Sequence, residues 1–382
     1  MIENFDLKQL VEPLQNWFAS NARVLPWRET PTAYKVWVSE IMLQQTRVEA
    51  VKPYFDRFIH ELPDVKALAE CPEDKLLKLW EGLGYYNRVR NMKIAAQQVM
   101  EEYGGVIPSG YEELIKLKGI GSYTAGAIAS IAYGEAVPAV DGNVLRVITR
   151  VAADDSDIMK ESTKKSIEQC LFDIMNDVQD GKTSVIPSIF NQALMELGAT
   201  VCVPNGAPHC DKCPWNGLCE AKRQNRIDEI PVKTKAKQRK IEKKTVLIIK
   251  DGEQLALHKR PAKGLLAGLY ELPNIPEHQS EENVLTFMKK QGYEPVRIQP
   301  LCDAKHIFSH VEWHMKGYVV FVASRELKRE EGAAEYDTLQ HDKQDWIFVD
   351  VEETRKNYAI PSAFSKYAEY LNLVLGKNVF EK

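Results

Sequence analysis

The sequence lacks the features of a membrane or secreted protein. Its longest apolar runs, such as TVLIIK and YVVFVA, are far too short to cross a bilayer. Its first residues, MIENFDLKQL, have neither the basic start nor the apolar core of a signal peptide. We therefore expect a cytoplasmic protein with no membrane association.

An excess of positive charge is also missing. The 382 residues include 50 Lys and Arg against 54 Asp and Glu, which gives a net charge of −4. This balance argues weakly against a nucleic-acid partner, but net charge averages over all faces, and an acidic protein can still carry a basic face. The length allows two or three domains, each with its own hydrophobic core.

Cysteine is scarce except in one place. Four of the seven cysteines lie in CVPNGAPHCDKCPWNGLC, residues 202–219, and the other three are far apart. In a reducing compartment, clustered thiols are better explained as metal ligands than as disulfide partners. The C-x2-C spacing suits a zinc ion or an iron–sulfur cluster, and the spacing alone leaves both open.

The chain changes character near residue 230. Before it, segments such as DLKQLVEPLQNWFA carry apolar residues at helical spacing. The stretch VKTKAKQRKIEKKT holds seven Lys or Arg and one Glu, which predicts a solvated basic linker over 231–244. Beyond it, TVLIIKDGEQLALHKR predicts a hairpin, GYVVFVAS and DWIFVDV predict strands, and AFSKYAEYLNLVLG predicts a closing helix. We expect a mostly α domain over 1–230 and an α+β domain over 245–382.

A glycine-rich turn joins two predicted helices in LKGIGSYTAGAIAS, residues 117–130. Glycines at 119 and 121 allow unusual φ values and a close backbone approach, and the following helix presents its N-terminus to an anion. This pattern is typical of a helix–hairpin–helix that binds a DNA phosphate without reading sequence. A tight turn between packed helices is the alternative.

Two acidic residues stand out against apolar surroundings. Asp141, in AVDGNVLRV, precedes a helix, so we expect it to cap that helix and to be kept ionised by backbone N–H groups. A fixed carboxylate of this kind can stabilise a developing cation. Glu40, in VSEIMLQQTRV, has apolar neighbours that predict a half-buried carboxyl with a raised pKa, suited to general acid catalysis. An exposed glutamate is the alternative for Glu40.

Taken together, these stretches resemble the helix–hairpin–helix DNA glycosylases, and among them the adenine DNA glycosylase (MutY) family. The matching segments run in family order from Leu25 to His310: LPWRETPTAYKVWVSEIMLQQTRVEAV, WEGLGYYNRVRN, LKGIGSYTAGAIASIAYG, AVDGNVLRV, FNQALMELGA, the four cysteines, GLLAGLYELP and FSH. The resemblance implies a six-helix barrel with a helix–hairpin–helix over 1–230, an iron–sulfur region over 186–222, and a Nudix-like domain over 245–382.

The resemblance also implies an activity, the removal of adenine mispaired with 8-oxoguanine or guanine in duplex DNA, by a monomer. In this reading Glu40 protonates adenine N7, Asp141 stabilises the sugar cation, and Asn143 orients the carboxylates or the attacking water. Tyr123 occupies the position where relatives that also cut the strand, such as endonuclease III, have a lysine. Because a phenol cannot form a Schiff base, we expect base removal without strand cleavage.

Further residue roles follow from the resemblance alone. Cys202, Cys210, Cys213 and Cys219 are the implied ligands of a four-iron, four-sulfur cluster, although seven residues separate the first two where the family usually has six. Gln45 and Tyr85 match residues that insert into the base stack. The remaining implied DNA contacts are Arg28, Lys118, Gly119, Gly121, Phe308, Ser309 and His310, of which the last three read 8-oxoguanine.

Two other functions compete with this one. An endonuclease III-like glycosylase with lyase activity is opposed by Tyr123 and by the C-terminal domain. A non-enzymatic iron–sulfur protein that binds DNA is opposed by the presence of both Glu40 and Asp141, since binding needs neither. The Nudix-like domain lacks an Arg-Glu-x-x-Glu-Glu core after GLLAGLYELP, so we expect it to recognise a base and not to hydrolyse a pyrophosphate.

Overall fold

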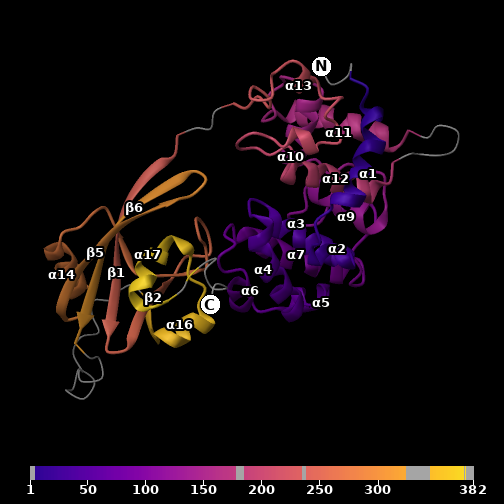
Figure 1. The fold of residues 1–382 in the computed structure, drawn as a ribbon. Helices are drawn as coiled ribbons and strands as arrows, with labels where there is room; N and C mark the ends of the chain where they lie inside the picture. Colours follow the sequence, from indigo (N-terminus) through magenta and orange to yellow (C-terminus); the bar gives the residue numbers. More distant parts are fainter. Residues whose placement is uncertain (1–4, 178–184, 235–237, 324–344, 374, 376–382) are drawn as a thin grey trace. The chain divides into compact units, whose positions relative to one another are not determined.

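The computed structural model describes residues 5–177, 185–234, 238–323, 345–373 and 375. The chain divides into two compact units (Figure 1). The first, here called the helical unit, comprises Met1–Cys71 and Arg90–Ala236. The second, the mixed unit, comprises Pro72–Val89 and Lys237–Lys382. Of the segment predicted to be a linker, residues 235–237 lie outside the described residues.

Short helices joined by tight turns build the helical unit. They are α1 (Val11–Asn21), α2 (Pro26–Glu29), α3 (Ala33–Leu43), α4 (Val48–Glu61), α5 (Val65–Glu70), α7 (Asn87–Glu102, most of it in this unit), α8 (Tyr111–Leu114), α9 (Ser122–Tyr133), α10 (Gly142–Val151), α11 (Glu161–Met175), α12 (Pro187–Thr200) and α13 (Glu220–Arg223).

Apolar spacing and capping explain why these segments are helical. In α4, Val51, Phe55 and Phe58 are buried on one face at intervals of three and four residues. Thr32 caps α3 and Asp64 caps α5 through side-chain oxygens that accept backbone N–H bonds. Helix α9 packs against both α3 and α12, and α12 also packs against α10. These contacts bring together residues that are far apart in the sequence.

A seven-stranded sheet forms the centre of the mixed unit. Its elements are α6 (Glu73–Leu79), β1 (Lys240–Asp251), β2 (Gln254–Lys259), β3 (Tyr270–Glu271), β4 (Asn274–Pro276), α14 (Glu281–Lys290), β5 (Pro295–Ile307), β6 (Val311–Val322), β7 (Trp346–Asp350), α16 (Val351–Asn357) and α17 (Ser365–Ala368). The strand order is β3-β2-β1-β6-β5, with β4 paired to β1 and β7 paired to β2. The β1–β6 pair is parallel, and the other described pairs are antiparallel.

The sheet has a hydrophobic core on each face. Val246 and Ile248 of β1 point into a cluster that includes Tyr367 of α17, while Leu247 and Ile249 point into a cluster with Met288 of α14. Alternate residues of a strand face opposite sides, so one continuous apolar run serves both layers. Figure 1 shows α14 and α17 on opposite sides of the sheet.

The predicted fold class is confirmed, with local differences. The hairpin at Asp251 and Gly252 forms, and Gly252 takes the left-handed φ of 57° that the turn requires. Strand β1 begins at Lys240, inside the segment predicted to be a linker, because its first residues pair with β6. The predicted C-terminal helix is α-helical over only Ser365–Ala368 in the described residues, since Asn372 turns left-handed soon after.

None of the described helices is both long and apolar enough to cross a membrane.

Candidate active site

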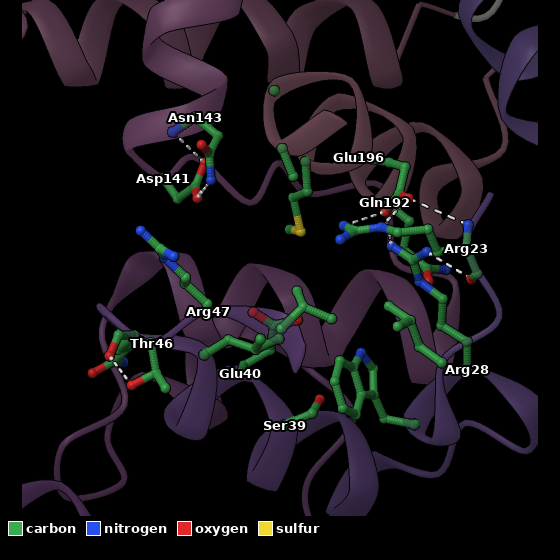
Figure 2. A pocket seen from close by; sticks show the side chains of 18 of the residues that line it. Arg23, Arg28, Ser39, Glu40, Thr46, Arg47, Asp141, Asn143, Gln192 and Glu196 are labelled. Carbon is green, nitrogen blue, oxygen red and sulfur yellow. Dashed lines mark hydrogen bonds and ion pairs between the residues drawn. The ribbon is translucent and has the colours of Figure 1, made fainter. Parts of the chain in front are cut away.

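A cavity in the helical unit has a volume of about 1090 Å³ (Figure 2). Its walls come from α3, α9, α10 and α12 and from the turn that follows α3. Cavities that hold small organic ligands typically measure about 300–1,000 Å³, so this one has room for a nucleotide. This cavity is lined by all four predicted catalytic residues, Glu40, Tyr123, Asp141 and Asn143.

Glu40 is a buried carboxyl at the floor of this cavity. It lies in α3 with only 6% of its surface exposed, and Tyr123 of α9 donates a hydrogen bond to its Oε2. Burial raises the pKa of Glu40 to about 7, and the Asp141 carboxylate adds to the rise, while the Tyr123 hydrogen bond and the Arg28 charge oppose it. A carboxyl with such a pKa can hold a proton near neutral pH and release it to a substrate.

Tyr123 keeps its own proton. Burial, together with the nearby Glu40 and Asp141 carboxylates, raises the pKa of the phenol well above its usual value. Its hydroxyl therefore acts as a donor to Glu40, and it also lies 3.7 Å from the Met195 sulfur. The residue is a neutral hydrogen-bond partner of the acid.

Asp141 caps α10, as predicted, and its pKa is raised above the ordinary value of an aspartate. Its Oδ1 accepts the backbone N–H groups of Asn143 and Val144, each at 2.8 Å, and its Oδ2 accepts the Asn143 side-chain amide at 2.7 Å. These bonds lower the pKa, yet burial raises it by more, and the net shift is upward. Figure 2 shows Asp141 across the cavity from Glu40.

Arg146 fixes the orientation of Asn143, a role that the sequence analysis did not predict. Its Nη2 donates to the Asn143 side-chain oxygen at 2.9 Å and to the Gly198 carbonyl at 2.8 Å, and its Nε donates to the Cys202 carbonyl at 2.9 Å. Arg146 is only 4% exposed, so these bonds satisfy a buried charge. The Asn143 amide is thereby committed to donate toward Asp141.

A buried cluster of two arginines and a glutamate forms another wall of the cavity. The Glu196 carboxylate, fully buried, accepts Nε and Nη2 of Arg23 at 2.5 and 3.0 Å and Nη2 of Arg28 at 2.9 Å. Burial raises the pKa of Glu196, but the two guanidinium groups outweigh it and lower the pKa overall. Sequence analysis predicted Arg28 as a DNA contact and missed its partners, because 168 residues separate Arg28 from Glu196.

The predicted hairpin lies between α8 and α9. Gly119 has a φ of +77°, and a Cβ there would lie 2.6 Å from the Cβ of Asn91, so both conformation and packing require glycine. Gly121 differs, since it has an ordinary φ of −96° and open space around its Cα. No side chain caps α9 at Gly121, which leaves this helix N-terminus suited to an anion, and Lys118 is exposed beside it.

The two residues predicted to enter the base stack share an uncommon backbone conformation. Gln45, after α3 in the helical unit, has a φ of 59°, and Tyr85, in the mixed unit, has a φ of 47°. Side chains other than glycine rarely adopt this region, and such conformations gather at functional sites. Tyr85 is 50% exposed. The sequence signal for its turn is the pair of glycines Gly82 and Gly84, both with positive φ.

In the mixed unit, Phe308, Ser309 and His310 form the turn between β5 and β6. The Phe308 N–H donates to the Val311 carbonyl at 2.8 Å, while Ser309 and His310 are exposed at the tip. The structure also brings Tyr85 to this turn, since the hydroxyls of Tyr85 and Ser309 lie 2.9 Å apart.

The four clustered cysteines line one small cavity of about 30 Å³. Arg150, 7% exposed, donates an N–H to the Cys202 sulfur at 3.4 Å and a second to the Ile230 carbonyl. The longer loop between Cys202 and Cys210 turns at Gly206, which has a φ of +73° and open space around it. Within the described residues, no three His, Cys, Asp or Glu side chains converge at the spacing of a single bound ion.

Comparison with known proteins first shows the class of protein to which this chain belongs. The HhH-GPD superfamily of base excision DNA repair proteins matches residues 38–171, and the NUDIX domain matches residues 245–370. The hairpin and the two carboxylates facing one cavity thus belong to a base excision DNA glycosylase of the helix–hairpin–helix class.

The particular family follows from two relatives. The chain is 35% identical over 357 residues to the adenine DNA glycosylase of Mus musculus, covering 78% of this chain and 68% of that one. It is 32% identical over 356 residues to the adenine DNA glycosylase of Buchnera aphidicola subsp. Schizaphis graminum, covering 93% and 96%. The protein belongs to the adenine DNA glycosylase family, which confirms the resemblance. A solved structure of a thermostable thymine-DNA glycosylase is similar with a TM-score of 0.48 and 26% identity, covering 57% of this chain and 96% of that one.

Proposed function

We propose that this protein removes adenine from duplex DNA where the adenine lies opposite 8-oxoguanine or guanine, and that it leaves the strand uncut. The observation that carries the proposal is the cavity with Glu40 and Asp141 on facing walls, because the Glu40 pKa of about 7 suits an acid and the Asp141 carboxylate is held in place. Family membership supports the base and the reaction type.

The proposed reaction begins with a flipped nucleotide, because a base inside the duplex cannot reach the cavity. Glu40 donates its proton to adenine N7, which makes the base a better leaving group. The C1′–N9 bond then breaks with its electron pair going to N9, and positive charge develops on the sugar. Asp141 stabilises that charge, as in retaining glycoside hydrolysis. Water finally adds at C1′ and gives one proton to the Glu40 carboxylate that the first transfer left ionised.

The other cavity residues have supporting roles in this proposal. Asn143, oriented by Arg146, holds the Asp141 carboxylate toward the sugar. The guanidinium groups of Arg23 and Arg28, fixed by Glu196, offer donors to the ring nitrogens of adenine, which are acceptors. Tyr123 holds Glu40 and supplies no amine, so no Schiff base forms and the sugar–phosphate backbone stays intact.

DNA contacts complete the proposal. The hairpin at Lys118, Gly119 and Gly121 binds a backbone phosphate at the N-terminus of α9. Gln45 and Tyr85, held in left-handed turns, fill the space that the flipped base leaves. Phe308, Ser309 and His310, here called the reader turn, contact 8-oxoguanine opposite the adenine. Ser309 and His310 are exposed and polar, as a contact with the added O8 and N7–H atoms requires.

A duplex cleavage assay tests the proposed function. We expect the protein to release adenine from an A:8-oxoguanine duplex and the strand to break only after alkali treatment, because an abasic site is alkali-labile. Breakage without alkali would support the glycosylase-lyase alternative. Release of no base, with the DNA still bound, would support the non-enzymatic alternative.

We also propose that Cys202, Cys210, Cys213 and Cys219 hold a four-iron, four-sulfur cluster. The four thiols suit the group, because all four line one cavity and four cysteine thiolates are the ligand set of such clusters. When bound, the cluster supplies a rigid cross-link. The residues of this chain carry out the base chemistry, and Arg146 and Arg150 donate to the Cys202 backbone and sulfur.

The composition of the purified protein checks this cluster proposal. We expect brown protein with about four iron atoms per chain and an equal amount of acid-labile sulfide. A variant with Cys302→Ser is the matched control, since Cys302 is exposed and lies in the mixed unit, and it should keep full iron content. Colourless protein that carries one zinc ion per chain would contradict the proposal.

A further inference from the structure

The reader turn has little support of its own. It is an exposed tip at the end of two strands, closed by the bond from the Phe308 N–H to the Val311 carbonyl. A protein that distinguishes two bases differing by a few atoms must hold its contacts within a fraction of an ångström. Support for Ser309 therefore has to come from elsewhere in the mixed unit.

The start of β1 provides that support. Arg239 Nε donates to the Phe308 carbonyl at 3.0 Å, and the Lys240 backbone N–H donates to the His310 carbonyl at 3.2 Å. These two carbonyls belong to the residues on either side of Ser309. The Phe308 carbonyl belongs to the peptide group that directly precedes Ser309, so Arg239 holds that group, while Lys240 holds the peptide group that follows His310.

The Phe308 side chain is held from the same strand. Its ring packs edge-on against Trp313, with centroids 4.8 Å apart, and Trp313 Nε1 donates to Glu242 of β1 at 3.1 Å. Lys244, also in β1, places its ammonium 4.6 Å from the Trp313 ring centroid. The backbone and the ring of Phe308 therefore both depend on β1.

We propose that Arg239 is a positioning residue for the reader turn, and that it fixes the Ser309 side chain for recognition of the base opposite adenine. The inference rests on the proposed reading of 8-oxoguanine by residues 308–310. Arg239 is exposed, so its bond to the carbonyl adds little to the stability of the mixed unit. The guanidinium group is charged and its Nε–H points along a fixed direction, which makes the bond a directional support for the turn.

An exposed arginine near bound DNA has another possible use, a direct contact with a phosphate. The two roles differ in measurable ways. A phosphate contact contributes equally on every duplex and adds about 0.9 to the slope of log affinity against log salt. A positioning role changes the ratio of affinities for two duplexes that differ only in the base that the turn reads, and it leaves the slope unchanged.

The test compares full-length Arg239→Ala with wild type on A:8-oxoguanine and A:G duplexes. The adenosine carries a 2′-fluoro group, which destabilises the sugar cation and leaves binding measurable. We expect Arg239→Ala to reduce the affinity ratio about tenfold, the size of effect expected when a charge-assisted hydrogen bond is lost, with no change of salt slope. Ser309→Ala should reduce the same ratio.

Lys243→Ala is the matched control. It removes the same charge from an exposed side chain of β1 and leaves the contacts of the Phe308 carbonyl and ring in place, so its affinity ratio should equal that of wild type. Thermal unfolding should place both variants close to wild type, because both side chains are exposed.

Two results would overturn the inference about Arg239 and leave the proposed function intact. One is an Arg239→Ala ratio equal to that of wild type. The other is an equal loss on both duplexes with a shallower salt slope, which identifies a phosphate contact. A wild-type protein that binds both duplexes equally would remove the proposed reading of 8-oxoguanine, and the inference with it.

Discussion

Replacement of Glu40 by glutamine is expected to stop adenine release while leaving DNA binding nearly unchanged. The amide has the size of the carboxyl and can still accept the Tyr123 hydrogen bond, but it has no proton to give at neutral pH. General acid catalysis typically contributes about 10²–10⁴-fold, and an effect confined to the transition state appears in the rate and not in the affinity. We expect a loss of at least about 10³-fold in the single-turnover rate.

The same substitution is expected to make the protein more stable at alkaline pH. The folded-state pKa of Glu40 is about 7 against an ordinary 4.5, so between these values the folded protein holds a proton that the unfolded chain has released. Stability therefore falls as pH rises through this window, and the ionised buried carboxylate costs about 3 kcal/mol above it. Glutamine avoids this cost, so Glu40→Gln should unfold several degrees above wild type at about pH 8.5 and less so at about pH 6.

Single-turnover kinetics on an A:8-oxoguanine duplex and thermal unfolding at the two pH values test both effects. Glu49→Gln is the matched control, because Glu49 lines the mouth of the same cavity, pairs with Lys52, and is mostly exposed. It should keep the wild-type rate and stability. A Glu40→Gln rate within about tenfold of wild type would remove Glu40 from the role of acid.

The parts of the site that the sequence predicted are those whose signal is local. Asp141 was visible as a cap because the helix it caps begins at the next residue. The four cysteines were visible as a group because they lie close together in the chain, and they line one cavity in the structure. The apolar residues on both sides of Glu40 indicated burial, and only 6% of its surface is exposed.

The parts that the sequence did not predict depend on distant contacts or on competing energies. Glu196 and its two arginines meet because α12 folds back near α2. The local sequence of neither segment predicts a contact with the other. Arg146 lies in an apolar helix, and only its hydrogen-bond acceptors in the fold explain why a charge is tolerated there. The hydrogen bonds that lower the Asp141 pKa are evident from the cap, whereas the depth of burial that outweighs them is not.

Backbone strain was equally hidden. The chain around Gln45 reads as a continuation of α3, yet Gln45 has a φ of 59° after the helix ends at Leu43. Left-handed residues other than glycine cost energy and persist only where surrounding contacts hold them. The sequence QQT, residues 44–46, contains no signal from which these surrounding contacts could be predicted. In the C-terminal segment a strong helical pattern gives α-helix only over Ser365–Ala368, between two short 3-10 helices, although Phe364, Tyr367 and Leu371 are buried at helical spacing.

Replacement of Asp141 by asparagine should separate its structural role from its catalytic one. Asparagine caps helices about as well as aspartate, and its side-chain oxygen can still accept the N–H groups of Asn143 and Val144. The helical unit should therefore fold and bind DNA as before. What is lost is the negative charge that faces the sugar cation, together with the carboxylate that could bond to C1′. We expect the single-turnover rate to fall by at least about 10³-fold, with DNA affinity within a few-fold of wild type.

Asp64→Asn is the matched control for this prediction, because Asp64 also caps a helix through a bond of 2.8 Å, to the Ala67 N–H, and does not line the cavity. Its rate should equal that of wild type. If both variants lost activity together with thermal stability, the loss at Asp141 would reflect helix capping and not charge. If Asp141→Asn kept its rate within about tenfold of wild type, the sugar cation would have to be stabilised by another group.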